Sequence, residues 1–140
     1  MAVTRIEGKP LVEGEAAGIA LTTDTPLSFW GGVDPHSGEI IDRRHPLDGE
    51  VISGRILVLP SGRGSCSASG VLLESIANNT APAGIIVSEI DPIIGLGAIL
   101  GDELLGRTVP VVLVTAEERK SIVDGVSVRI GLTGIVEIGE

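Results

Sequence analysis

The chain has 140 residues, 43% of them hydrophobic and 21% charged, a balance typical of one folded domain over residues 1–140. The net charge of −9 argues against binding to nucleic acid or an anionic membrane surface, and no apolar run reaches the roughly 18 residues of a membrane span. A single Cys allows no internal disulfide and no all-cysteine metal site, and the first residues lack a signal-peptide pattern, so we expect a cytoplasmic protein.

The first elements predicted along the chain are β-strands, a short one at 3–6 and a longer one at 17–23. Residues 24–48 contain three prolines and several glycines, which predicts a long irregular segment, and such segments in compact domains are usually functional or mobile. Residues 49–59, EVISGRILVLP, predict one or two strands, because a continuous apolar run such as ILVLP is typical of a strand buried on both faces.

Beyond residue 60, predicted helices alternate with predicted buried strands. The order is helix 69–79, strand 84–89, helix 93–106, strand 109–115, a short polar helix at 116–122 and a β-hairpin at 126–139. This alternation is typical of parallel βαβ units. We therefore expect an α/β domain with a parallel βαβ centre, on which the β-rich ends pack as an additional β layer.

The segment PSGRGSCSASG, residues 60–70, lies between a predicted buried strand and a predicted helix. Its glycines allow a sharp turn, and the following amides lie at a helix N-terminus, where unpaired N–H groups bind carboxylate or phosphate. A guanidinium beside them suits bidentate binding of a carboxylate. The residues expected to contact a substrate in this turn are Arg63, Gly64, Cys66 and Ser67. Alternatively, a serine here only caps the helix, the glycines only shape the turn, and Cys66 is a small packing residue.

Other candidate residues lie outside this turn. Asp34 and His45, in the irregular segment, are expected to orient a substrate or its carboxylate, or, for Asp34, to stabilise a turn. The histidines and nearby aspartates match no metal-ligand spacing, so no metal site is predicted in this chain. Glu89 and Asp91 follow a buried strand, where ligand-binding loops gather, although Asp91 before a proline is more typical of a helix N-cap. The charged run 117–120 predicts a solvated helix face.

A resemblance to the small, swivelling subunit of aconitase X is carried by residues 30–74, WGGVDPHSGEIIDRRHPLDGEVISGRILVLPSGRGSCSASGVLLE, and continues through residues 81–114. The resemblance implies an aconitase-like swivelling β/β/α domain. Members of this family dehydrate small hydroxy acids, either cis-3-hydroxy-L-proline or mevalonate 5-phosphate. The run SCSASG and the block DELLGRTVPVV are more similar to the hydroxyproline branch.

The same resemblance implies the roles of residues and partners. Ser65 would be the base that abstracts the proton from the substrate. A large subunit would hold an iron–sulfur cluster or iron, with no cofactor bound by this chain alone, and the two chains would form at least a heterodimer. Two alternatives remain. One is the small subunit of a mevalonate 5-phosphate dehydratase, and the other is a non-catalytic module that holds a carboxylate or phosphate in the same turn.

Overall fold

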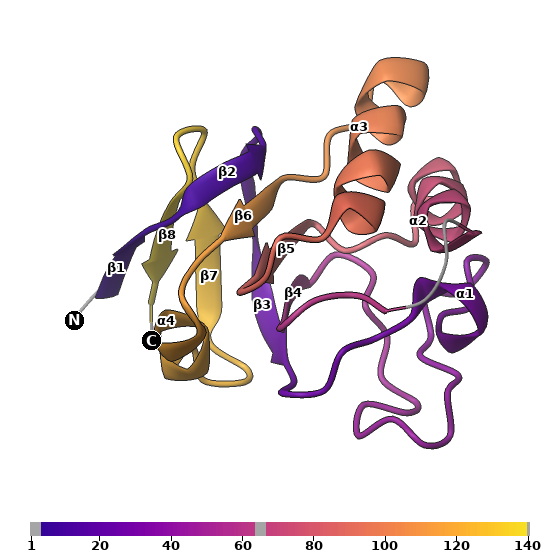
Figure 1. The fold of residues 1–140 in the computed structure, drawn as a ribbon, viewed down its shortest axis with the longest axis horizontal. Helices are drawn as coiled ribbons and strands as arrows, with labels where there is room; N and C mark the ends of the chain where they lie inside the picture. The colour runs from indigo at the N-terminus through magenta and orange to yellow at the C-terminus, as the bar shows by residue number, and fades with distance from the viewer. Residues whose placement is uncertain (1–3, 64–66, 140) are drawn as a thin grey trace.

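The structure is a computed structural model that describes residues 4–63 and 67–139. Within these ranges lie eight strands and four helices (Figure 1). The strands are β1 (Thr4–Glu7), β2 (Lys9–Val12), β3 (Ala16–Thr22), β4 (Ile56–Leu59), β5 (Gly84–Val87), β6 (Val111–Leu113), β7 (Ser127–Ile130) and β8 (Ile135–Ile138), and the helices are α1 (Phe29–Gly32), α2 (Ser67–Ala77), α3 (Pro92–Leu105) and α4 (Ala116–Ser121). The predicted helices at 69–79 and 93–106 are thus confirmed, each beginning one or two residues earlier than expected.

The centre of the sheet is parallel, as the alternation of strands and helices predicted. β3 pairs with β4, β4 with β5 and β5 with β6, all in the parallel sense. α2 connects β4 to β5 and α3 connects β5 to β6, and the two helices pack against each other on one face of these strands (Figure 1). The carboxyl ends of β4 and β5 therefore lie side by side where each strand leads toward its helix.

The antiparallel strands form the second β layer. β7 pairs with β3 and with β8, and β8 pairs with β1, all antiparallel. The strand order is β1-β8-β7-β3-β4-β5-β6-β2, and Figure 1 shows β1, β7 and β8 on the side of the central strands away from α2 and α3. The expected β/β/α arrangement is confirmed.

Two apolar cores explain why the central strands are hydrophobic throughout. In β4, Ile56 and Val58 belong to the core between the two β layers, whereas Leu57 and Leu59 belong to the core beneath the helices. All four side chains are fully buried, because alternate residues of a strand point to opposite faces and here both faces are covered.

The two ends of the strand order are neighbours in the chain, so the sheet curls into a nearly closed barrel. β1 lies at one end and β2 at the other, and only Gly8 separates them. A Cβ on Gly8 would collide with Val112 Cγ1 and lie 2.9 Å from the carbonyl oxygen of Gly134, so this crossing requires glycine. β2, which contains Pro10, was not predicted from the sequence.

The irregular segment before β4 is packed rather than extended into solvent. Leu27, Phe29, Ile40 and Ile52 are fully buried in the core beneath the helices. Isolated bridges join Val33 to Ile40 and Glu39 to Val51, so the segment folds back on itself. None of the helices in the described ranges has both the length and the apolar composition to cross a membrane.

The charged run in α4 corrects one expectation. We expected residues 117–120 to form a solvated face, and this is wrong for Arg119, whose side chain is buried. Its Nε donates to Ser88 Oγ at 3.0 Å and its Nη1 to Asp24 Oδ1 at 2.9 Å. The guanidinium therefore ties α4 to the segments that follow β3 and β5, which the helical charge pattern alone does not reveal.

Candidate functional site

The loop that follows β4 is held on both sides by backbone hydrogen bonds. The carbonyl oxygen of Pro60 accepts from the amides of Ser88 and Glu89, at 3.1 and 3.0 Å. On the other side, the amide of Arg63 donates to the carbonyl oxygen of Leu27 at 3.2 Å. Residues 60–63 are thus fixed between the loop after β5 and the irregular segment, which gives the start of the serine-rich turn a defined position.

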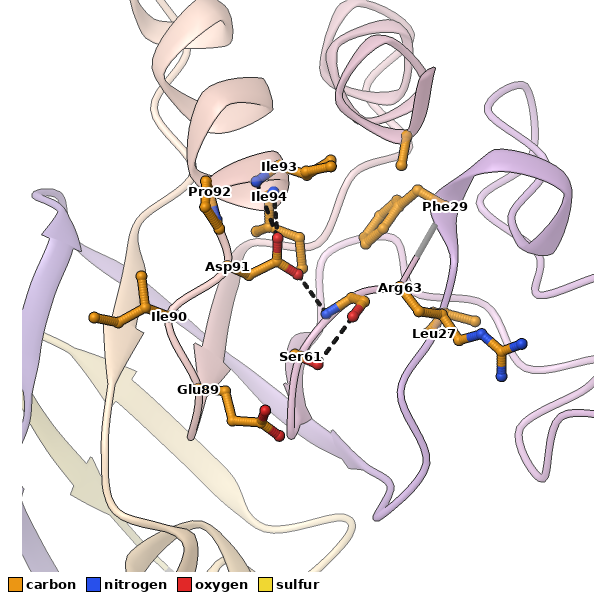
Figure 2. A pocket seen from close by; sticks show the side chains of 12 residues that line it. Leu27, Phe29, Ser61, Arg63, Glu89, Ile90, Asp91, Pro92, Ile93 and Ile94 are labelled. Atoms are coloured by element: carbon orange, nitrogen blue, oxygen red, sulfur yellow. Dashed lines mark hydrogen bonds between the residues drawn. The ribbon is translucent and has the colours of Figure 1, made fainter. Parts of the chain in front are cut away.

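Asp91 links this loop to the start of α3 (Figure 2). Its Oδ1 accepts from the amides of Ile93 and Ile94, at 3.0 and 3.2 Å, so the predicted helix N-cap is confirmed. Its Oδ2 accepts from the amide of Gly62 at 2.6 Å. A Cβ on Gly62 would lie 2.7 Å from Asp91 Oδ2, so the short contact requires a glycine at this position. The contact with Gly62 was not predicted.

Two hollows of opposite charge flank the loop. The first, which we name the carboxylate hollow, has a volume of about 220 Å³ and is lined by Phe29, Gly62, Arg63, Glu89, Asp91 and Ile94 among others. The second, the arginine hollow, has a volume of about 500 Å³ and is lined by Thr25, Asp42, Arg43, Arg44, His45 and Arg63 among others. Arg63 borders both and is exposed.

Six of the seven predicted site residues fall into three groups. Arg63 and His45 line the same hollow, the arginine hollow, although they are far apart in the sequence. Ser67 is the first residue of α2 and is exposed. Gly64, Ser65 and Cys66 lie outside the described residues, in the short stretch of chain that joins Arg63 to Ser67.

His45 is buried, and both of its ring nitrogens contact backbone groups. Nδ1 accepts from the amide of Leu47 at 3.1 Å, which leaves Nε2 to donate to the carbonyl oxygen of Thr25 at 3.2 Å. The imidazole therefore fastens its own turn to the segment after β3. This arrangement favours a role for His45 in shaping the arginine hollow over direct hydrogen bonding to a substrate.

Asp34 occupies a turn away from these residues. Its Oδ1 accepts from the amide of His36 at 2.9 Å, and its carbonyl oxygen accepts from the amide of Gly38 at 2.7 Å. Asp34 is not among the described residues that line either hollow. The geometry favours the turn-stabilising alternative for this residue.

Sequence reasoning did not single out Arg43 and Arg44, which line the arginine hollow. The only signal was a pair of adjacent arginines in an acidic chain, within a segment already expected to be irregular. Without the position of Arg63, this pair reads as ordinary surface charge.

A comparison with protein families identifies the domain. The family model described as the aconitase X swivel domain matches residues 5–138. The chain belongs to the aconitase X swivel-domain family. This match confirms the resemblance inferred from the sequence and extends it over almost the whole chain.

Relatives in this family have two kinds of names. A cis-3-hydroxy-L-proline dehydratase of Pseudomonas aeruginosa is 54% identical over 103 residues, 74% of this chain and 18% of that protein. Its counterpart from Hypocrea jecorina is 40% identical over 136 residues, 96% of this chain and 23% of that protein. The phosphomevalonate dehydratase small subunit of Methanopyrus kandleri is 48% identical over 104 residues, 73% of this chain and 77% of that one. The aconitase X swivel domain described here thus spans about a fifth of each hydroxyproline dehydratase.

Solved structures agree with the swivel-domain fold. A chain in the crystal structure of the holo-form of Thermococcus kodakaraensis aconitase X superposes with a TM-score of 0.88 at 37% identity, covering 98% of this chain and 99% of that one. A UPF0107 protein studied by solution NMR gives a TM-score of 0.85 at 33% identity, covering 98% of this chain and 100% of that one.

Proposed function

We propose that this chain is the small subunit of an aconitase X-type hydro-lyase that dehydrates a small hydroxy acid, with cis-3-hydroxy-L-proline as the preferred substrate. The proposal is supported most directly by the loop after β4. Asp91 and Leu27 anchor this loop through the amides of Gly62 and Arg63, which precede α2 in the chain. The 54% identity to a protein named cis-3-hydroxy-L-proline dehydratase supports the choice of substrate.

Ser65 is the proposed base. It would take the proton from the carbon next to the substrate carboxylate, the carbon–hydroxyl bond would break, and the hydroxyl would leave as water after receiving a proton. The enamine that results from hydroxyproline would tautomerise to a pyrroline carboxylate. Because negative charge develops on the carboxylate in this step, the Arg63 guanidinium and the amides at the start of α2 are proposed to stabilise it.

The proposed substrate contacts are those predicted from the sequence, except that the hydrogen bonds of two residues favour indirect roles. Arg63, Gly64, Cys66 and Ser67 are proposed to border the substrate, since they surround the proposed base in the chain. For His45 and Asp34 the hydrogen bonds favour indirect roles, in which the first shapes the arginine hollow and the second stabilises its own turn.

Iron–sulfur chemistry, which the aconitase-like fold implies, does not fit the donors among the described residues. No three His, Cys, Asp or Glu residues within 4–63 and 67–139 lie close enough together to hold a metal. We propose that the cluster or iron is held by a large partner subunit, which the relatives named small subunit support, and that this chain forms with it a cytoplasmic heterodimer or a multiple of one.

The second candidate substrate is mevalonate 5-phosphate. It is favoured by relatives named phosphomevalonate dehydratase small subunit, of which the chain from Methanopyrus kandleri is 48% identical over 104 residues. If the chain is not part of an enzyme, the alternative is a non-catalytic module that binds a carboxylate or phosphate.

Reconstitution tests the proposed function. The chain would be co-produced with the large aconitase X subunit from its own source, supplied with iron and sulfide, and assayed with each acid separately. We expect dehydration of cis-3-hydroxy-L-proline by the complex and by neither chain alone. Dehydration of mevalonate 5-phosphate instead would select the alternative substrate, and a stable complex inactive on both acids would contradict the assignment as a dehydratase.

A further inference from the structure

We infer that Arg43 and Arg44, together with Arg63, form a subsite for an oxyanion of the substrate, and that the substrate enters from this side of the loop. This inference rests on the proposed function and deepens it. The shared ligand chemistry is an oxyanion, which is a carboxylate on hydroxyproline or a carboxylate or phosphate on mevalonate 5-phosphate. Guanidinium groups bind both by paired, charge-assisted hydrogen bonds.

The charge distribution of the chain is the first observation that carries the inference. The chain has 10 Lys and Arg residues against 19 Asp and Glu, yet three of its arginines line one hollow. A concave surface lined by cations concentrates the field and raises the local concentration of anions. Three cations against the one carboxylate of Asp42 therefore give this hollow of an acidic chain an electrostatic reason to receive an anion.

The guanidinium groups of these arginines are available for a ligand. Three of the other arginines have partners in the chain. Arg55 pairs with Glu50, Arg119 pairs with Asp24, and Arg107 donates to the last carbonyl oxygens of α2. Across residues 4–63 and 67–139, no ion pair or side-chain hydrogen bond is found for Arg43, Arg44 or Arg63. An anion can therefore bind these three guanidinium groups without breaking an ion pair or hydrogen bond to another described residue.

The backbone that carries these arginines is held in place. The amide of Arg44 donates to Asp42 Oδ1 at 3.0 Å, and the amide of His45 donates to the carbonyl oxygen of Asp42 at 3.0 Å. The buried imidazole of His45 then ties this turn to Thr25. A fixed backbone limits the flexibility lost on binding to the arginine side chains themselves.

The carboxylate hollow on the other side of the loop is unsuited to an acidic substrate. Glu89 and Asp91 line it, and both oxygens of Asp91 already accept hydrogen bonds. In Figure 2 the guanidinium of Arg63 points away from Asp91 and Glu89, so it does not offset their charge. An anion approaching the loop is repelled on this side and attracted on the side of Arg43 and Arg44.

Steady-state kinetics of the two-subunit enzyme test the inference. The variants are Arg43→Gln, Arg44→Gln and the double substitution. The matched control is Arg5→Gln, an exposed arginine on β1 that removes the same charge at the far end of the strand order. We expect KM to rise about tenfold or more in the double variant, with kcat kept where the bound oxyanion is a phosphate and lowered where it is the carboxylate on which charge develops, and the control to keep both values.

The two acids distinguish the source of the oxyanion. For the acid that is not dehydrated, its inhibition constant takes the place of KM. A rise in this constant and in KM, with both acids, places a carboxylate in the subsite, and a rise confined to mevalonate 5-phosphate places the phosphate there. An unchanged KM overturns the inference while the proposed function stands. Weaker binding of the large subunit with KM unchanged also overturns the inference, because the arginines would then contact the partner protein and not the substrate.

A second readout is independent of turnover. If the complex dehydrates neither acid, the isolated 140-residue chain would be titrated with inorganic phosphate and with acetate while the arginine Nε–Hε signals are followed by NMR. Shifts of the Arg43, Arg44 and Arg63 signals with either probe, lost in the double variant and kept in Arg5→Gln, would support the subsite although the proposed function had failed. The absence of shifts with both probes would overturn it.

Discussion

Asp91 accepts hydrogen bonds from three backbone amides that belong to two different segments. Two of the amides begin α3, and the third, that of Gly62, lies in the loop after β4. Hydrogen bonds to an ionised acceptor are stronger than neutral ones, and each unpaired amide left by their loss costs free energy. One carboxylate therefore both caps a helix and fixes the loop that leads to the proposed base.

Substitution of Asp91 separates these two roles. Asp91→Asn keeps one acceptor oxygen and loses the other, so it cannot serve both segments. We expect a loss of about 1 kcal/mol in the free energy of unfolding for Asp91→Asn and about 2–3 kcal/mol for Asp91→Ala, which loses both roles. Urea unfolding of the chain measures these differences. If Asp91→Asn keeps the helix cap, wild-type stability of this variant would show that the contact with Gly62 contributes nothing.

Of the two roles of Asp91, only the cap was predictable from sequence. An aspartate before a proline at the start of an apolar helix predicts an N-cap, because all the groups involved lie within three residues. The amide of Gly62 lies 29 residues away, and nothing local predicts that contact. The hydrogen bonds of His45 are hidden for the same reason, since Thr25 is 20 residues distant.

At the scale of elements, the packing of α3 on α2 depends on a glycine at the contact. A Cβ on Gly97 would lie 2.9 Å from the carbonyl oxygen of Ser69 and 3.1 Å from Leu72 Cβ, neither of which can move without shifting α2. Gly95, two residues earlier in α3, has nothing within 4 Å of its Cβ position. Gly95 therefore serves as a matched control for substitutions at Gly97, because both lie in α3 and only a Cβ on Gly97 would contact α2.

Alanine at these two positions should have opposite effects. We expect Gly97→Ala to lower the free energy of unfolding by about 1–3 kcal/mol through overpacking. Gly95→Ala should raise it by about 0.5–1 kcal/mol, because alanine favours the helix over glycine where there is room. Denaturant unfolding of both variants checks the prediction, which fails if Gly97→Ala is as stable as Gly95→Ala.

Elements with strong local signals were predicted, and those with weak signals were not. The continuous apolar runs of β4 and β5 predicted buried parallel strands because both of their faces are covered. β2 has four residues, one of them Pro10, and proline is depleted in strands, so its pairing with β6 had no local signature. The burial of Arg119 likewise depends on distant partners.

At the scale of the whole molecule, the crossing between β1 and β2 closes the sheet. β1 extends the antiparallel layer and β2 covers the edge of β6, so one short connection covers both ends of the strand order. Covering β6 also removes an exposed strand edge that would otherwise pair with another chain. The extra β layer was predicted, but this closure was not, because it joins strands that are remote in sequence.

Gly8 is the residue on which this closure depends. We expect Gly8→Ala to lower the free energy of unfolding by about 1–3 kcal/mol, because its Cβ collides with Val112 in the neighbouring strand. Gly131→Ala is the control, since its Cβ would meet only the carbonyl oxygen of Ile135, at 3.7 Å. Thermal unfolding monitored by circular dichroism measures both. Equal stability of the two variants would mean that the crossing tolerates a side chain.

We propose that this chain supplies the base for a dehydration that a second subunit completes. The most direct test of this proposal is the turnover of cis-3-hydroxy-L-proline by the reconstituted complex with Ser65→Ala in this chain. The account predicts that kcat falls about 10²- to 10⁴-fold, while the unfolding free energy of the chain and its affinity for the large subunit stay unchanged. Near-wild-type turnover by this variant would contradict it.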